Sequence, residues 1–220
     1  MIIVGGGLSG LLAARKFAGT NYDVLLVERE DALGGVLKNA DKIKSINDQP
    51  TDEWLEKTER LIRNSNNIKI LKNTLVTTYN FSDHLIALED KNVGKPQDNE
   101  KPELVLHKIR TKHTILANGH IERFITFRNN DLPGVMLAAS FEKYLNRYGV
   151  VPDESPVIFT NNSSTFSLLK SLTDLGHKPK AYVDVRDQKI IEKETVDLLE
   201  KFNIPFYPKS EIEGCEGQKE

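Results

Sequence analysis

The hydrophobic positions of the N-terminal region alternate between short apolar runs and helical periodicity. Residues 1–4 form an apolar run, and residues 11–18 follow with a pattern typical of a helix. A second buried strand is expected over residues 23–28, and residues 52–64 place their apolar side chains on one side of a helix. This order of strand, helix and strand predicts a parallel α/β sheet built from βαβ units.

The middle of the chain has the shorter alternation of β-structure, and the last third returns to the α/β pattern. Strands are expected at 68–71, 74–79, 85–88, 104–109 and 113–116. A second βαβ pattern begins at residue 156, after a helix expected over 137–148. We therefore expect one Rossmann-like domain over residues 1–150, with a β-meander as an insert. Residues 151–220 are expected to be the truncated start of a second Rossmann-like domain.

Composition and charge narrow the range of functions. The formal net charge is −2, so nothing favours nucleic acid or an anionic membrane as a partner. No apolar run approaches the roughly 20 residues that a membrane-spanning helix needs. The single cysteine, Cys215, allows neither an internal disulfide nor a redox pair, and the five histidines lack metal-ligand spacing. We expect a cytoplasmic protein without a metal site.

A glycine motif connects the first strand to the first helix. Gly5, Gly7 and Gly10 have the spacing G-x-G-x-x-G of a dinucleotide-binding turn. Gly5 would make the tight turn out of the strand, and Gly10 would let the helix pack closely on it. Gly7 has no Cβ, so a pyrophosphate can approach the backbone at the positive end of the helix. The pattern predicts a bound dinucleotide. The alternative is a degenerate fold of the same kind that holds no ligand.

Three further positions extend this prediction. Glu28 lies 18 residues after Gly10, close to the roughly 20 expected for the carboxylate that binds the adenosine ribose. Gly35 belongs to a Gly-Gly pair soon after this acid, a pattern of the glutathione-reductase-like flavoproteins. Gly119 follows the strand at 113–116, where the backbone of such flavoproteins passes close to the cofactor. Asn118 replaces the threonine that is usual there.

The second βαβ unit lacks the chemistry of the first. Its turn over residues 160–164 contains no glycine. A phosphate cannot approach residues that carry side chains as it approaches glycine. We expect this unit to have the architecture of an NAD(P)H site and to bind no pyridine nucleotide.

The chain resembles the α subunits of heterotetrameric sarcosine oxidases and the related α subunits of amino-acid dehydrogenases, opine dehydrogenases and hydrogen cyanide synthase. The resemblance runs from Ile2 to about Tyr207, and the block 129–150 is its most specific part. The segments that carry it are 53–54, 74–80, 121–123, 129–138, 144–150, 159–162 and 183–186.

The resemblance implies a two-dinucleotide-binding-domain flavoprotein fold of the glutathione-reductase type, with NAD or FAD at the first Rossmann site. It also implies that amine oxidation takes place on a flavin of a partner β subunit, where the small amine binds, and that this chain holds no catalytic residue. Gly5, Gly7 and Gly10 would lie on the pyrophosphate, with Glu28 and Arg29 at the ribose. Gly35 and Gly119 would lie near the cofactor, and Val76 would meet the adenine through its backbone.

Two departures from that family bear on the expected completeness of the first domain. Family α subunits have an upstream ferredoxin-like segment, and they continue past the point that corresponds to residue 220. There they return to the first domain and add an aminomethyltransferase-like domain. We therefore expect a first domain that is incomplete at its C-terminal end, with an exposed sheet edge. A fragment is favoured over a subunit that is split between two chains.

The leading functional prediction is the nucleotide-binding α subunit of a sarcosine-oxidase-like oxidoreductase that acts on secondary amines. One alternative is a self-contained FAD-dependent NAD(P)H oxidoreductase. The glycine-free turn at 160–164 and the lack of a redox cysteine pair argue against it. The other alternative is a non-catalytic scaffold with a vestigial nucleotide site.

Overall fold

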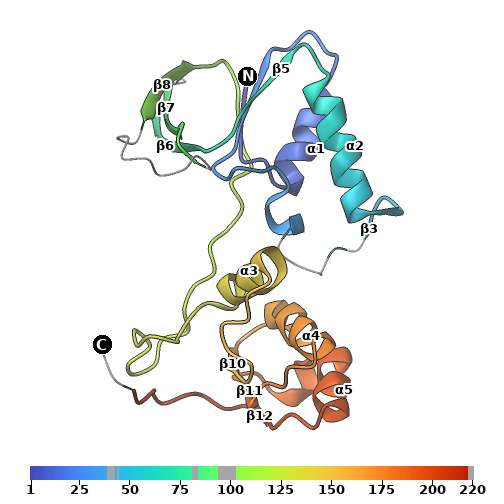
Figure 1. Cartoon of the computed structure of the whole chain (residues 1–220), viewed down its shortest axis with the longest axis vertical. Helices are drawn as coiled ribbons and strands as arrows, with labels where there is room; N and C mark the ends of the chain where they lie inside the picture. Colours follow the sequence, from blue (N-terminus) through green and yellow to red (C-terminus); the bar gives the residue numbers. More distant parts are fainter. Residues whose placement is uncertain (39–42, 44, 81–83, 94–102, 218–220) are drawn as a thin grey trace. The chain divides into compact units, whose positions relative to one another are not determined.

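The computed structural model describes residues 1–38, 43, 45–80, 84–93 and 103–217. These residues divide into two compact units, which part between His120 and Ile121 (Figure 1). None of the helices in the described ranges combines the length and apolarity that a bilayer span requires.

The first unit is built on a four-stranded parallel sheet with the order β5-β2-β1-β9. Its strands are β1 (Ile2–Val4), β2 (Val24–Val27), β5 (Ile68–Leu71) and β9 (Thr114–Leu116). The short central strand β1 has a neighbour on each side, because Ile2 is in register with both Leu25 and Thr114. This parallel sheet is the one that the apolar runs predict.

Two helices cover one face of this sheet, α1 (Leu8–Phe17) and α2 (Thr51–Arg63), and they lie side by side (Figure 1). Their apolar faces pack on alternate residues of the strands, so that Ile3 and Leu26 are buried with Leu11 and Trp54. Between β2 and α2 lie the short helix η1 (Gly35–Lys38) and the hairpin of β3 (Ser45–Ile46) with β4 (Gln49–Pro50).

An antiparallel meander covers the other face. It consists of β6 (Thr74–Asn80), β7 (His84–Asp90) and β8 (Leu104–Arg110), in that order. Leu85 of β7 is buried against Ile2 and Val27 of the parallel sheet. Because successive residues of a strand face opposite sides, Ile2 and Ile3 bury their side chains in two different clusters.

The second unit contains a three-stranded parallel sheet with the order β10-β11-β12. Its strands are β10 (Val157–Thr160), β11 (Ala181–Asp184) and β12 (Phe206–Pro208). Its helices are α3 (Ala138–Tyr148), η2 (Ser163–Thr165), α4 (Phe166–Asp174), η3 (Gln188–Ile190) and α5 (Lys193–Lys201). The core holds Leu169, Leu172, Tyr182 and Leu199.

The two units part at a different place from the expected domain boundary at residue 150. Helix α3 lies before that boundary, yet its side chains Phe141 and Leu145 are buried with Leu168 and Tyr182 of the second unit. An amphipathic pattern shows that a helix has an apolar face but does not show which sheet that face covers. The roles of the two regions as first and second nucleotide-type domains stay predictions.

Candidate functional site

The glycine turn lies at the carboxyl ends of three neighbouring strands. The N–H of Gly5 donates to the carbonyl of Val27 at the end of β2, at 2.8 Å. On the other side, the N–H of Ala117 donates to the carbonyl of Val4, also at 2.8 Å. The chain leaves β1 toward β2 and returns to the sheet at β9, so this is the point where the strand order changes direction. Open α/β sheets bind their ligands at such points.

Gly5 and Gly10 are each required by the packing of the turn itself. Gly5 has φ +102°, and a Cβ there would lie 2.3 Å from the carbonyl oxygen of Ala117. A Cβ on Gly10 would lie 1.8 Å from the carbonyl oxygen of Gly5. Real side chains do not reach such distances, so the strand, the turn and α1 can come this close only with glycine at both positions.

Gly7 differs from the other two glycines of the motif. Its φ is −75°, and a Cβ there would meet no atom within 4 Å. Gly7 caps helix α1, which has neither a side-chain hydrogen bond at its N-cap nor an acidic residue in its first turn. The N-terminus of α1 therefore has no side-chain cap and no acid in its first turn, and the Cβ position of its N-cap residue is open. A pyrophosphate fits this arrangement, because helix N-termini offer both donors and positive potential.

The carboxylate of Glu28 is held at the edge of the same turn. Its side chain is buried, with 7% of the residue surface exposed. Oε2 accepts the N–H of Gly6 at 2.6 Å, and Oε1 accepts the N–H of Glu30 at 2.8 Å. Each carboxylate oxygen has a further lone pair, so the group can still accept two hydroxyl donors. The ribose of an adenine nucleotide offers such a pair of donors.

The pair Gly34-Gly35 braces the glycine turn from the neighbouring loop. The N–H of Gly34 donates to the carbonyl of Gly6 at 2.8 Å, and Gly7 and Gly34 form a parallel bridge. A Cβ on Gly35, which has φ +53°, would lie 3.1 Å from the Cα of Gly7. Sequence reasoning missed this bracing. The signal for it is a run of three glycines after the first strand and a pair of glycines in the loop after the second.

The remaining predicted positions lie around this centre. Arg29 follows Glu28 on the surface, where its side chain is 68% exposed and lies 3.5 Å from Glu30. Gly119 comes two residues after Ala117 and has φ +70° with open space at its Cβ. Val76 lies on β6, the strand that joins Glu28 through the hydrogen bond from the N–H of Thr74 to the Glu28 carbonyl, at 2.9 Å.

Strand β6 leaves backbone groups available near Val76. It is an edge strand of the meander among the described residues, and its register with β7 shifts between Val76 and Thr78. The side chain of Val76 packs toward the buried cluster of Ile2, Val27 and Leu85. A contact of Val76 with an adenine would therefore use its backbone.

The equivalent turn of the second unit is closed by its own side chains. Asn162 accepts the N–H of Ser164 at 2.8 Å through its side chain. Arg186 donates to the fully buried Asp184 from Nε at 3.0 Å and from Nη2 at 2.8 Å, and from Nη1 to the hydroxyl of Ser163 at 3.1 Å. The hydrogen bond to Asp184 raises the pKa of Arg186. Ser163 in turn donates to Glu192.

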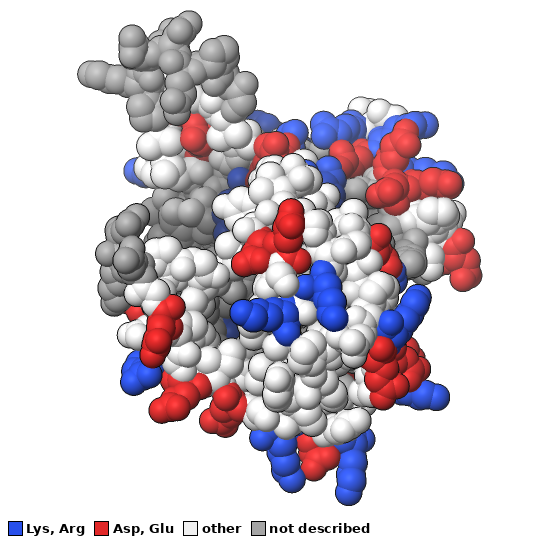
Figure 2. Space-filling model, turned by 60° about the horizontal axis from the view of Figure 1, so that its bottom comes forward, with Lys and Arg blue, Asp and Glu red and all other residues white. Residues whose placement is uncertain are grey.

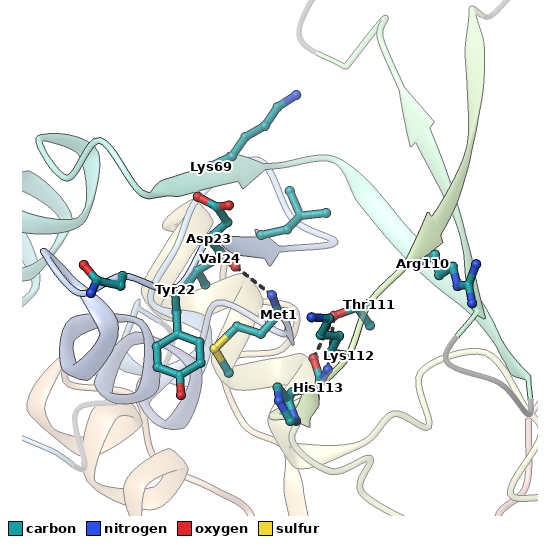
Figure 3. A pocket seen from close by; sticks show the side chains of 11 residues that line it. Met1, Tyr22, Asp23, Val24, Lys69, Arg110, Thr111, Lys112 and His113 are labelled. Carbon is teal, nitrogen blue, oxygen red and sulfur yellow. Dashed lines mark hydrogen bonds between the residues drawn. The ribbon is translucent and has the colours of Figure 1, made fainter.

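A surface hollow lies at the opposite end of the first unit's parallel sheet (Figure 3). Its lining comes from the amino ends of β1, β2 and β5 and from the segment before β9, including Tyr22, Lys112 and His113. The amino group of Met1 donates to the carbonyl of Asp23 there, at 2.6 Å. The side chain of Lys69 points away from the hollow (Figure 3). The hollow is therefore separate from the glycine turn, which lies at the carboxyl ends of the strands.

Charge is mixed over the surface. Lysine and arginine side chains are interspersed with aspartate and glutamate among the described residues of the face in Figure 2. Within the described ranges, no group of three histidine, cysteine, aspartate or glutamate side chains is arranged to hold a metal ion.

Comparison with known proteins defines the class of the fold. Residues 3–52 match the family described as NAD(P)-binding Rossmann-like domain. The thioredoxin reductase of T. acidophilum superposes with a TM-score of 0.65 at 14% identity, over 99% of this chain and 66% of that one. The L-proline dehydrogenase of P. horikoshii superposes with a TM-score of 0.61 at 23% identity, over 84% of this chain and 35% of that one. The predicted α/β fold of the glutathione-reductase-like flavoproteins is confirmed.

The comparison also identifies a particular relative. Over 180 residues, 80% of its length, the chain is 31% identical to the sarcosine oxidase subunit alpha of Corynebacterium sp. (strain U-96). The chain spans 18% of the length of that subunit. The resemblance to sarcosine oxidase α subunits is therefore confirmed. The match of residues 3–52 supports the predicted class of cofactor, NAD or FAD, at the first Rossmann site.

Proposed function

We propose that the first unit binds the ADP half of NAD or FAD at the carboxyl edge of its parallel sheet. The pyrophosphate lies against Gly7 and the first turn of α1, and the adenosine ribose donates its hydroxyls to Glu28. Gly5, Gly10 and Gly35 shape the turn. The other contacts of the proposed site come from Arg29 at the ribose, Val76 at the adenine and Gly119 beside the cofactor.

The open space beside Gly7 carries this proposal. A φ of −75° is available to any residue, and a Cβ would meet nothing within 4 Å, so the fold itself does not require glycine there. A ligand that approaches the backbone gives the glycine a physical reason. Gly7 is also the N-cap of α1, which has no side-chain cap, and the neighbouring Gly6 donates its N–H to the carboxylate of Glu28.

We further propose that the chain acts as the nucleotide-binding α subunit of a sarcosine-oxidase-like oxidoreductase. The similarity over 80% of the chain supports this assignment. The oxidation of the CH–NH bond of a secondary amine takes place on a flavin of a partner β subunit, which also binds the amine. A flavin, when bound, supplies the two-electron acceptor for such an oxidation. The residues of this chain bind and orient the nucleotide.

The geometry disfavours a self-contained NAD(P)H oxidoreductase. Such an enzyme needs a second nucleotide site, and the turn over residues 160–164 carries side chains where a phosphate would have to approach. Asn162 and Ser163 are engaged there by hydrogen bonds within the unit. A vestigial scaffold is disfavoured because Gly7 has neither a positive φ nor a neighbouring atom that would exclude a side chain, so that only a ligand gives the glycine a further reason.

The substitution Gly7→Ala tests the proposed site. We expect it to weaken binding of NAD or FAD by the nucleotide-free 220-residue chain roughly 10- to 100-fold, because the methyl group separates the pyrophosphate from its charged hydrogen bonds. The free energy of unfolding should fall by no more than about 1 kcal/mol, the cost of alanine at an N-cap. Isothermal titration calorimetry and urea unfolding measure the two quantities. Unchanged affinity for both nucleotides would exclude the proposed site.

A further inference from the structure

Gly6 occupies the variable position of the glycine motif, but the structure surrounds it closely. Its N–H donates to Oε2 of Glu28 at 2.6 Å. A Cβ on Gly6 would lie 3.0 Å from the same oxygen, 3.2 Å from the Cβ of Glu28 and 2.5 Å from Cδ2 of Leu33. The missing side chain of Gly6 thus lets Glu28 lie against the turn.

The backbone does not explain the glycine at this position. Gly6 is absent from the set of described glycines with positive φ, which includes its neighbour Gly5. A left-handed φ therefore does not explain the glycine at position 6. The three atoms nearest to a Cβ at position 6 all belong to two side chains, those of Glu28 and Leu33.

Leu33 has little freedom to move away from a methyl group at position 6. It is 1% exposed and belongs to the core cluster that includes Leu11 and Trp54. Close-packed cores resist such displacement. Because Leu33 is held in the core, the methyl group at position 6 would also press on the side chain of Glu28 and shift its carboxylate away from the N–H of Gly6.

We propose that Gly6 is a positioning residue that sets the specificity of the ribose site by holding Glu28 against the turn. This inference rests on the proposed nucleotide site. In its observed place, the carboxylate can accept two ribose hydroxyls and repels a 2′-phosphate. The neighbouring cation, Arg29, is 68% exposed and lies 3.5 Å from Glu30, so in this structure it pairs with Glu30 rather than with Glu28. The site should therefore bind nucleotides with a free 2′-hydroxyl more tightly than their 2′-phosphates.

The test uses ADP-ribose and its 2′-phosphate, because the first probe contains the ADP moiety that NAD and FAD share. Both are titrated into the nucleotide-free 220-residue chain, native and Gly6→Ala. We expect the native chain to prefer ADP-ribose. In the variant, we expect ADP-ribose to bind roughly 10- to 100-fold more weakly, because the displaced carboxylate loses its charged hydrogen bonds to the ribose. The 2′-phosphate should lose less affinity, so the ratio of the two affinities should shrink about tenfold or more.

Gly7→Ala is the matched control. It should weaken both probes by the same factor, since both carry the pyrophosphate. If Gly7→Ala leaves both affinities unchanged, the proposed nucleotide site is wrong. If Gly7→Ala weakens both probes but Gly6→Ala leaves their ratio unchanged, the site stands and the role of Gly6 is wrong.

A second variant keeps the proposal testable if Gly6→Ala does not fold. In Gly6→Ala/Leu33→Ala, the space left by Leu33 lets the methyl group move away from Glu28. The preference for ADP-ribose should then return to within about threefold of that of Leu33→Ala alone, a difference well below the loss of one charged hydrogen bond. A double variant that binds ADP-ribose and its 2′-phosphate equally well, beside a Leu33→Ala chain that still discriminates, would overturn the proposal.

Discussion

At the scale of single residues, each of the four glycines of the turn is glycine for a different structural reason. Gly5 has a positive φ, and Gly10 has a backbone oxygen where its Cβ would be. Gly6 has neighbouring side chains in that place, and Gly7 has empty space. The glycines of the motif therefore do not all indicate the same property. Two of its glycines serve the fold, and the other two are explained by the proposed ligand site.

Gly10→Ala separates the glycines that serve the fold from those that serve the ligand. Helix propensity alone predicts that alanine within α1 stabilises the protein by up to about 1 kcal/mol. The contact of 1.8 Å with the Gly5 carbonyl predicts the opposite sign. We expect a loss of about 3 kcal/mol in the free energy of unfolding, the upper range for overpacking. Urea unfolding measures it, with Gly7→Ala as the control. A Gly10→Ala chain as stable as the native one would contradict the geometry.

At the scale of elements, the strand and helix types are predictable from the sequence to within a few residues. The strand expected at 113–116 is observed as Thr114–Leu116, and the helix expected over 137–148 is observed as Ala138–Tyr148. The periodicity of the apolar residues is enough to tell strands from helices, because buried residues recur at every second position in a strand and at every third to fourth position in a helix. It does not say where α3 packs, since Phe141 and Leu145 would suit either sheet.

The local geometry of the glycine turn can also be predicted from the sequence. The long-range contacts that hold the turn in place cannot. The tight turn at Gly5 and the close packing at Gly10 follow from the spacing of the motif. The contact between Gly6 and Glu28 joins positions 22 residues apart in the sequence, and the bridge between Gly7 and Gly34 joins positions even more distant. Such contacts depend on the register of the strands, which no local pattern reveals.

The β7–β8 hairpin contains a carboxylate that should make stability depend on pH. Glu89 is held by Lys91, at 2.9 Å from Nζ to Oε1, and by His107, at 2.7 Å from Nε2 to Oε2. The hydrogen bond from Lys91 is the main cause that lowers the pKa of Glu89 below its ordinary value of 4.5, and burial opposes it. A carboxylate with a lowered folded-state pKa stabilises the protein above its unfolded pKa, and this contribution is lost as the pH falls through the folded value.

Glu89→Gln should therefore be less stable than the native chain at pH 7, and the difference should be smaller at a pH well below 4.5, the ordinary pKa of Glu89. Urea unfolding across this range measures the effect on the first unit. The exposed Glu154 provides the control, since Glu154→Gln should leave the stability unchanged at both pH values. A difference between native and Glu89→Gln that persists undiminished at low pH would show that the effect is one of packing rather than charge.

At the scale of the whole molecule, the chain contains two units with the same strand–helix alternation and different turn chemistry. In the first unit, the carboxyl edge of the sheet is lined by glycine and by a helix without a side-chain cap. In the second, Arg186 joins the end of β11 to the turn after β10, because it binds both Asp184 and Ser163. Similar folds therefore predict similar architecture but not similar binding, since binding depends on what occupies the turn.

This difference predicts that the nucleotide-free chain binds a single NAD or FAD and no second pyridine nucleotide. Calorimetric titration with NAD, NADH and NADPH should give a stoichiometry of at most one per chain, and Gly7→Ala should weaken that single site. Introducing glycine into the second unit with Asn162→Gly should not create another site, because Arg186 remains bound to the fully buried Asp184 and still crosses to Ser163. A second site that survives Gly7→Ala, or rapid reduction of a bound flavin by NADH, would favour a self-contained NAD(P)H oxidoreductase. It would also show that side chains at residues 160–164 move aside for a phosphate.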